Sequence, residues 1–246
     1  MPSMYEIYDR DARGYDALVA AEDYEGNLCR TLRGIVVWND ARVVEAGIGT
    51  GRVTRCYVDV ASRVHGYDRS AHMLARAREN LASWADRVEL APADHRALPA
   101  ASGEADIFVE GWAFGHAVVD AVSGAVSASA DSAASPRAAV ERVAAELVAE
   151  ARRVVRPGGT VIVVETLGTN VDRPGAPLPE LADFYRALEN RYGFEREVIR
   201  TDYRFDSPQE AEKRCRFFFG DDLADGVRSR GSAVVPEYTG VWWMRT

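Results

Sequence analysis

A glycine-rich segment directly after a short strand constrains this chain more than any other feature. Residues 42–46 form a predominantly β-branched run, and Gly47, Gly49 and Gly51 follow before a segment from Arg52 that we expect to be helical. Glycines in such a turn let the backbone pass close to a ligand, and the free N–H groups of the next helix point toward it. Strand, glycine turn and helix are the opening of a nucleotide-binding α/β fold.

Predicted strands and helices alternate along the rest of the chain. We expect further strands at residues 61–67, 88–91, 107–110, 160–165, 196–205 and 234–244. We expect helices within residues 5–33, in the segment that carries Met73 and Leu81, and at residues 136–155, 179–191 and 208–219. Residues 120–135 are rich in Ala and Ser and are predicted to form a mobile loop. This alternation favours a parallel sheet with helices on both faces.

Length and charge narrow the class of protein. The 246 residues fit one large α/β domain, since such folds run to about 250 residues. With 30 basic and 38 acidic residues the net charge is −8, which argues against a protein that binds mainly nucleic-acid phosphate. We find no apolar run of about 18 residues, and the N-terminus is polar. We therefore expect a cytoplasmic protein that contacts neither nucleic acid nor membrane.

The cysteines and possible metal ligands give no site. Cys29, Cys56 and Cys215 are widely separated and form no Cys-x-x-Cys pair, so we expect reduced thiols and neither a disulfide framework nor a zinc site. Histidines and carboxylates form no cluster with metal-ligand spacing. The sequence predicts no metal.

Three acidic residues lie at or just past the ends of three successive predicted strands. Glu45 precedes the first glycine by two residues, where a carboxylate would repel a pyrophosphate but can hold an amino-acid ammonium, directly or through water. Asp68 is placed to accept hydrogen bonds from a ribose diol, and Asp94 from an adenine amino group. Arg52 stands where the dinucleotide pattern Gly-x-Gly-x-x-Gly requires glycine. The pattern favours an adenosine-containing zwitterion over a dinucleotide.

These segments resemble the motifs of class I S-adenosylmethionine-dependent methyltransferases, including ubiquinone and menaquinone biosynthesis enzymes and many small-molecule methyltransferases. Residues 45–51 resemble the family's first motif, 66–70 its ribose motif, 93–95 its adenine motif and 153–159 its turn before the fifth strand. The resemblance implies a Rossmann-like, doubly wound sheet of seven strands, mostly parallel with an antiparallel last strand. It also implies S-adenosyl-L-methionine as cofactor and S-adenosyl-L-homocysteine as product.

A set of residues around these motifs is expected to contact the cofactor. Ile48 and Met73 are candidates to sandwich the adenine ring. The resemblance implies that Tyr15, in an N-terminal segment that closes over the cofactor in related enzymes, lies near the methionine carboxylate. The predicted cofactor site comprises Tyr15, Glu45, Gly47, Ile48, Gly49, Gly51, Asp68, Arg69, Met73, Asp94, His95 and Glu110.

The methyl acceptor is expected beside residues 110–116, because the segment after the fourth strand borders the reacting methyl group in this family. A general base is needed only if the acceptor arrives protonated. His116 is the first candidate and His95 the second, since imidazole titrates near neutral pH. Trp112 and Phe114 are candidates for the walls of an apolar acceptor pocket.

We therefore predict an enzyme that transfers a methyl group from S-adenosylmethionine to a small molecule. Its single domain, 1–246, consists of an N-terminal helical cap (1–38), a cofactor-binding core (39–166) and a C-terminal part that completes the sheet (167–246). A non-catalytic protein of the same fold that binds S-adenosylmethionine or S-adenosylhomocysteine is one alternative. An NAD-dependent oxidoreductase is less favoured, as is a protein or nucleic-acid methyltransferase. We expect a monomer or a homodimer.

Overall fold

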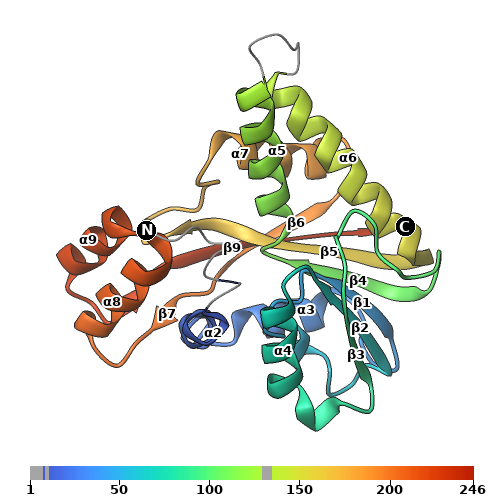
Figure 1. Ribbon diagram of the computed structural model, residues 1–246, viewed down its shortest axis with the longest axis horizontal. Coiled ribbons are helices and arrows are strands. Elements are labelled where there is room, and N and C mark those ends of the chain that lie inside the picture. Colours follow the sequence, from blue (N-terminus) through green and yellow to red (C-terminus); the bar gives the residue numbers. More distant parts are fainter. Residues whose placement is uncertain (1–7, 9–10, 129–134) are drawn as a thin grey trace.

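The central sheet has seven strands in the order β3-β2-β1-β4-β5-β9-β6 in the computed structural model, which describes residue 8, residues 11–128 and residues 135–246. Strand β9 runs antiparallel to both of its neighbours, and the other pairs are parallel. The strands are β1 (Arg42–Ala46), β2 (Arg63–Asp68), β3 (Val88–Pro92), β4 (Ala105–Gly111), β5 (Val155–Thr169), β6 (Glu195–Arg200) and β9 (Glu237–Arg245). This arrangement confirms the expected fold class (Figure 1).

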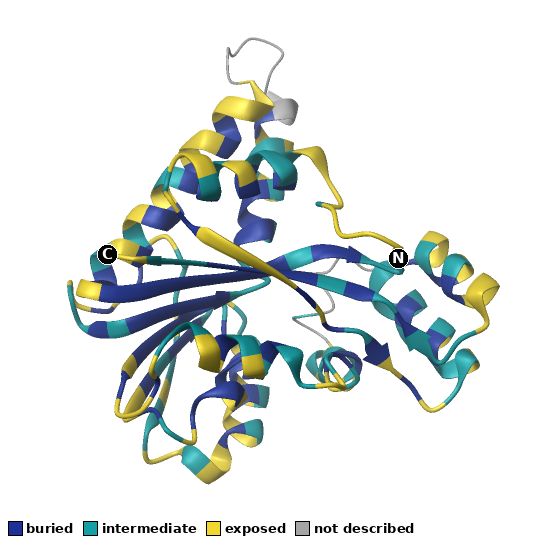
Figure 2. Cartoon of the chain, turned by 180° about the vertical axis from the view of Figure 1, so that it is seen from behind, coloured by how far each residue is buried: buried dark blue, intermediate teal, exposed yellow. Residues whose placement is uncertain are grey.

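Helices cover both faces of the sheet. The α-helices are α2 (Ala12–Val19), α3 (Asn27–Ile35), α4 (Ala71–Asn80), α5 (Phe114–Ala128), α6 (Pro136–Val154), α7 (Pro179–Asn190), α8 (Pro208–Phe219) and α9 (Asp221–Arg230), with 3₁₀ turns η1 (Thr54–Cys56) and η2 (Ala82–Trp84). Helices α5, α6 and α7 lie on one face, and α3 and α4 lie on the other (Figure 1). The strands between these layers are largely buried (Figure 2).

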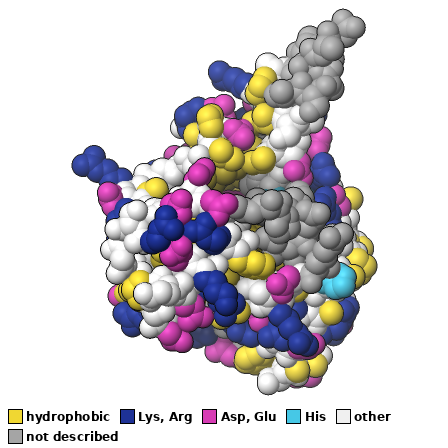
Figure 3. Space-filling model, turned by 60° about the vertical axis from the view of Figure 1, so that its left-hand side comes forward, with side chains coloured by type: hydrophobic (Ala, Val, Ile, Leu, Met, Phe, Trp, Pro, Cys, Tyr) yellow, Lys and Arg dark blue, Asp and Glu magenta, His cyan; other side chains and the backbone are white. Residues whose placement is uncertain are grey.

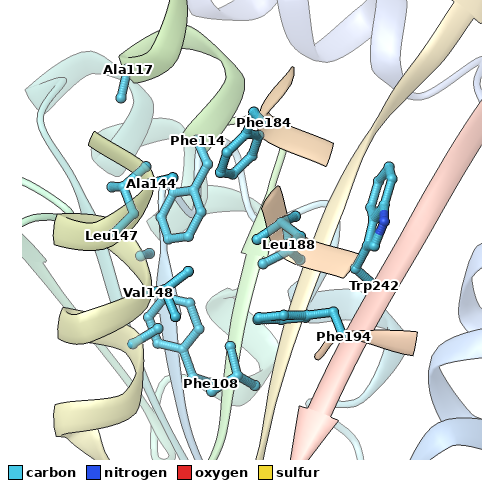
Figure 4. Close-up of a cluster of buried hydrophobic side chains, with 14 of the residues drawn as sticks. Phe108, Phe114, Ala117, Ala144, Leu147, Val148, Phe184, Leu188, Phe194 and Trp242 are labelled. Carbon is cyan, nitrogen blue, oxygen red and sulfur yellow. The ribbon is translucent and has the colours of Figure 1, made fainter. Parts of the chain in front are cut away.

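The unbroken apolar run of β5 packs against both layers. Val161 and Val163 belong to the cluster under α5, α6 and α7, whereas Ile162 and Val164 belong to the cluster under α3. This follows from the two-residue repeat of a strand. Trp242 is fully buried beneath α7 (Figure 4).

A small unit leaves the sheet between β6 and β9. The chain forms the two-stranded sheet β7 (Tyr203–Arg204) and β8 (Val234–Val235), with α8 and α9 between them. Its core includes Leu18 of α2, so this unit and the N-terminal segment pack together. The predicted strand 196–205 is therefore two strands, because the chain turns away from β9 after residue 200.

The expected helix directly after the glycine turn is absent. Residues 52–60 consist of turns and the short η1. Val53, Thr54, Cys56, Tyr57 and Val58 are buried, whereas Arg55 and Asp59 are exposed, which is the burial pattern of an amphipathic helix. The chain nevertheless forms turns around η1 in this segment.

Three other elements differ from the expected ones. The N-terminal helical region is interrupted at residues 20–26 between α2 and α3, and residues 5–7 and 9–10 of the predicted helix lie outside the described residues. Residues 120–128 of the predicted loop belong to α5, since alanine favours helix, and residues 129–134 lie outside the described part. Helix α9 was not predicted, although its acidic first turn and basic last turn suit the helix dipole.

A disulfide joins Cys29 of α3 to Cys56 of η1. The expectation of reduced thiols is wrong for these two residues and agrees with the free, buried Cys215. The pairing could not be read from the sequence because tertiary packing of α3 on η1 brings together cysteines 27 positions apart. Disulfides persist mainly in oxidising compartments, so this bond does not support the expected cytoplasmic location.

Candidate active site

A cavity of about 500 Å³ opens at the carboxyl ends of β1, β2 and β4. The strand order reverses between β1 and β4, and such a switch point is where open α/β sheets bind ligands. The volume lies in the range of small-molecule sites. The lining residues are Tyr8, Tyr15, Gly47, Gly49, Asp68, Arg69, Ser70, Met73, Ala93, His95, Arg96, Gly111, Trp112, Ala113, His116, Ala117, Asp120 and Ala121.

The glycine turn forms the floor of this cavity. Gly47 has a φ of 68° and Gly49 a φ of 56°, in the left-handed region that favours glycine. A Cβ at position 47 would lie 2.3 Å from the Cβ of Ala113, so no side chain fits between this turn and the segment after β4. Gly51 also has a positive φ but packs against Leu81 and does not line the cavity.

Asp68 is held at the end of β2 by the backbone around it. Its carboxylate accepts hydrogen bonds from the Gly49 N–H (2.9 Å) and the Ser70 N–H (2.8 Å). Burial raises the pKa of this carboxyl group, and the two N–H donors oppose that rise. A carboxylate has about four acceptor positions, so Asp68 can still accept from the hydroxyls of a bound ribose.

Only some of the residues expected around the adenine line the cavity. Arg69, Met73 and His95 line the cavity, but Ile48 and Asp94 do not. Asp94 instead pairs with Arg96, whose guanidinium lies 2.9 Å from the carboxylate and lowers its pKa.

Ile48 and Glu45 lie beneath the glycine turn. Ile48 packs against Leu74 and Leu81. Glu45 is 1% exposed, and its carboxylate accepts hydrogen bonds from the hydroxyls of Thr54 (2.7 Å) and Tyr57. Burial raises the pKa of Glu45 to about 7. Glu45 does not line the cavity, and hydroxyls of the following segment bind the Oε2 of the carboxylate that was expected to hold a ligand ammonium.

Aromatic side chains of the N-terminal segment form one wall of the cavity. Tyr15 lies on α2, and its ring centroid is 5.2 Å from that of Tyr8 and 5.5 Å from that of Phe218. Burial raises the pKa of Tyr15 to about 12, so its phenol stays neutral. Tyr15 therefore lines the cavity, as predicted, together with Tyr8, and Phe218 packs against both rings without lining the cavity.

The two histidine candidates lie in the same cavity. The Nε2 of His116 is 3.1 Å from the hydroxyl oxygen of Tyr8. Burial lowers the pKa of His116, and it lowers that of His95 to about 4, so both imidazoles are neutral near pH 7. A neutral imidazole is the form that accepts a proton. The Nε2 of His95 is buried and has no hydrogen-bond partner among the described residues.

A buried ion pair behind the cavity was missed by sequence reasoning. Arg52 pairs with Glu22, and its guanidinium carbon lies 3.7 Å from the ring centroid of Trp112. Trp112 lines the cavity and has a φ of 55°, which is uncommon for a large side chain. Arg52 and Glu22 are 30 positions apart, so the only sign of this ion pair in the sequence was the charge of Arg52 next to the glycine turn.

The remaining predicted residues of the segment after β4 are structural neighbours of the cavity. Glu110 is fully buried and does not line it, because its carboxyl accepts from the backbone of the segment that follows. Phe114 is also fully buried and packs against Phe108, so it is a core residue and not a pocket wall (Figure 4). Across residues 8, 11–128 and 135–246, no group of three His, Cys, Asp or Glu side chains is suited to a metal ion.

Comparisons with known proteins agree with this geometry. A family model described as a methyltransferase domain matches residues 43–137. The lovastatin nonaketide synthase mokA of Monascus pilosus is 26% identical over 193 residues, which cover 75% of this chain and 5% of that protein. The chain therefore spans only a small part of this curated relative. No helix in the described ranges is long and apolar enough to cross a membrane.

Solved structures share the fold. A SAM-dependent methyltransferase from Aquifex aeolicus is similar with a TM-score of 0.51 and 14% identity, and the match covers 100% of both chains. The phosphoethanolamine N-methyltransferase 2 of Haemonchus contortus, in complex with phosphomonomethylethanolamine and S-adenosylhomocysteine, gives a TM-score of 0.57 and 17% identity. That match covers 100% of this chain and 60% of the other.

Proposed function

We propose that this chain, a member of the class I S-adenosylmethionine-dependent methyltransferases by its domain match and its fold, transfers the methyl group of that cofactor to a small-molecule nucleophile. The observation that carries the proposal is the cavity that Gly47, Asp68, Tyr15, Trp112 and His116 line together. This cavity has room for an adenosine-containing ligand beside aromatic side chains and a neutral imidazole.

The residues present fit S-adenosylmethionine. The Gly47–Gly49 turn provides a surface without side chains, where an added Cβ at position 47 has no room. Asp68 keeps free acceptor positions for the ribose hydroxyls beside this turn. Met73 and His95 lie around the same cavity and can contact the adenine.

The chain's own role in the reaction is to place the acceptor and to take up its proton. S-adenosylmethionine, when bound, would supply a methyl group activated by its sulfonium. Tyr15 and Trp112 wall the cavity and exclude water from the reacting atoms. His116 acts as general base for a protonated acceptor, with the Tyr8 hydroxyl within hydrogen-bond distance of its Nε2.

A small acceptor is favoured by the size of the cavity and by the charge of the surface. About 500 Å³ suits a cofactor together with the reactive part of a small molecule. On the face shown in Figure 3, Lys and Arg side chains are interspersed with Asp and Glu, which does not suit a polyanion. The phosphoethanolamine N-methyltransferase among the similar structures, in complex with phosphomonomethylethanolamine, also supports a small-molecule acceptor.

Calorimetric titration with S-adenosylmethionine, S-adenosylhomocysteine and NADH tests the cofactor. We expect micromolar binding of the first two and none of NADH. Methyl transfer to a panel of amines, phenols, thiols and carbon acids then tests catalysis. His116→Ala should lower turnover of the protonated acceptors by about 100-fold. The matched control His72→Ala, on the exposed side of α4, should be neutral. Cofactor binding without turnover of any acceptor would favour the non-catalytic alternative.

A further inference from the structure

Two glutamates lie fully buried next to the cavity without lining it. Glu110 is on β4 and Glu165 is on the neighbouring strand β5, and their exposed fractions are 0% and 3%. Within the described residues, neither carboxyl group has a cationic partner among its main interactions. Two adjacent carboxyl groups in an apolar interior therefore need an explanation other than a salt bridge.

Both glutamates bind the beginning of α5. The Oε1 of Glu110 accepts hydrogen bonds from the N–H groups of Ala113 and Phe114, the latter at 2.9 Å. The Oε1 of Glu165 accepts from the N–H of Gly115 at 2.5 Å. These three consecutive N–H groups are among the donors that a helix N-terminus leaves without intrahelical partners. The carboxyl pair therefore replaces an ordinary capping residue.

The two carboxyl groups accept from consecutive N–H groups and interact with each other, and the buried Oε2 of Glu110 has no other partner among the described residues. A hydrogen bond between the two carboxyl groups requires a shared proton, because two carboxylates can only accept. Burial is the main reason that the pKa of Glu165 is raised to about 7, and burial followed by the charge of Glu165 raises that of Glu110 well above its usual range. The single remaining negative charge faces the positive end of the α5 dipole.

The capped turn carries the residues that face the ligand. Trp112 precedes it with a φ of 55° and donates its N–H to the Val164 carbonyl (2.8 Å), and His116 lies in the first turn of α5. We propose that Glu110 and Glu165 act as one proton-sharing, singly charged pair that positions the start of α5, and with it Trp112 and His116, at the cavity. Their role in the reaction rests on the proposed function, whereas the shared proton does not.

Other titratable groups near the pair carry no competing charge at neutral pH. Tyr185 of α7 donates its hydroxyl to the Thr166 carbonyl (3.0 Å), and burial raises its pKa. Glu237, at the start of β9, also interacts with Tyr185, and burial raises the pKa of Glu237 to about 8. On α5 itself, His116 is neutral because burial lowers its pKa.

Infrared spectroscopy of the protein without ligand tests the shared proton. At about pH 9, carboxyl groups with a pKa of about 7 or 8 have lost their proton. The Glu110–Glu165 pair should still hold its one shared proton, so one infrared band of a protonated carboxyl group should remain. Glu110→Gln and Glu165→Gln should each remove the same band, whereas the control Glu237→Gln, equally buried, should retain it. Persistence of the band in Glu165→Gln would overturn the proposal, since Glu110 would then hold its proton without a partner.

Gly115→Ala tests the positioning role without changing any charge. A Cβ at residue 115 would lie 2.8 Å from the Oε2 of Glu165 and would displace the carboxylate from the helix. Gly124→Ala in the same helix meets no atom within 4 Å and is the matched control. We expect S-adenosylhomocysteine to bind Gly115→Ala about tenfold more weakly and the control like the native protein. Equal affinities would refute the positioning role. Failure of the native protein to bind would refute the proposed function and leave the infrared result intact.

Discussion

Reduction of the Cys29–Cys56 disulfide should lower the free energy of unfolding by about 3.5 kcal/mol. The bond closes a segment of 27 residues, and the chain-entropy relation for a loop of that length gives this magnitude at 25 °C. For a chain of 246 residues, each kcal/mol changes the melting temperature by about 2–4 °C, so the transition should fall by roughly 7–14 °C.

Thermal unfolding with and without a thiol reductant measures this effect. The double variant Cys29→Ser/Cys56→Ser should melt near the reduced protein and should not respond to reductant. Cys215→Ser is a suitable control, because it alters a buried free thiol and should lose stability equally with and without reductant. Titration of three free thiols in protein unfolded without reductant, together with a reductant-independent transition, would show that the reasoning is wrong.

Three changes in the cavity give further tests. Gly47→Ala should abolish binding of S-adenosylhomocysteine in calorimetry, because the added Cβ would lie 2.3 Å from that of Ala113. The control is Gly26→Ala, which has a similar φ but open space around it. It should lose about 1–2 kcal/mol of stability and bind S-adenosylhomocysteine normally. Asp68→Ala should weaken that binding by roughly 1–3 kcal/mol, and native affinity would remove Asp68 from the site. The fall of kcat/KM at low pH should have its midpoint below pH 6.5, because burial lowers the pKa of His116 and protonation would remove the base. This fall should be absent in His116→Ala. An unchanged fall in that variant would show that His116 is not the general base.

The parts of the site that lie at strand ends were predictable from local spacing. Gly47, Gly49 and Asp68 line the cavity as expected, because a strand that ends in a turn presents these positions at the edge of the sheet whatever the rest of the chain does. The same reasoning did not reveal the surroundings of Glu45. Its Oε2 accepts from the hydroxyls of both Thr54 and Tyr57, and nothing in the spacing shows where those hydroxyls point.

Contacts between distant segments decided what the sequence did not reveal. The Tyr8 hydroxyl and the His116 ring are 108 positions apart, and they meet only because the N-terminal segment lies across the carboxyl end of the sheet. A helix was expected after Arg52 from its local pattern, and the structure has turns and the short η1 there. The mobile loop expected at residues 120–135 relied on low complexity, whereas the alanines at 120–128 extend α5.

Residues 202–236 form an insertion that could be replaced as a whole, because its two ends lie close together. Its two ends meet at the sheet, where the Thr201 N–H donates to the Glu237 carbonyl (3.0 Å), and β7 and β8 pair just beyond. Its Phe218 reaches the tyrosines of the cavity, while the glycine turn and Asp68 lie on strands that a replacement would leave in place. Replacing residues 202–236 would therefore change what packs on the tyrosines of the cavity and leave the predicted cofactor residues in place, provided that the new segment keeps the apolar contacts to Leu18.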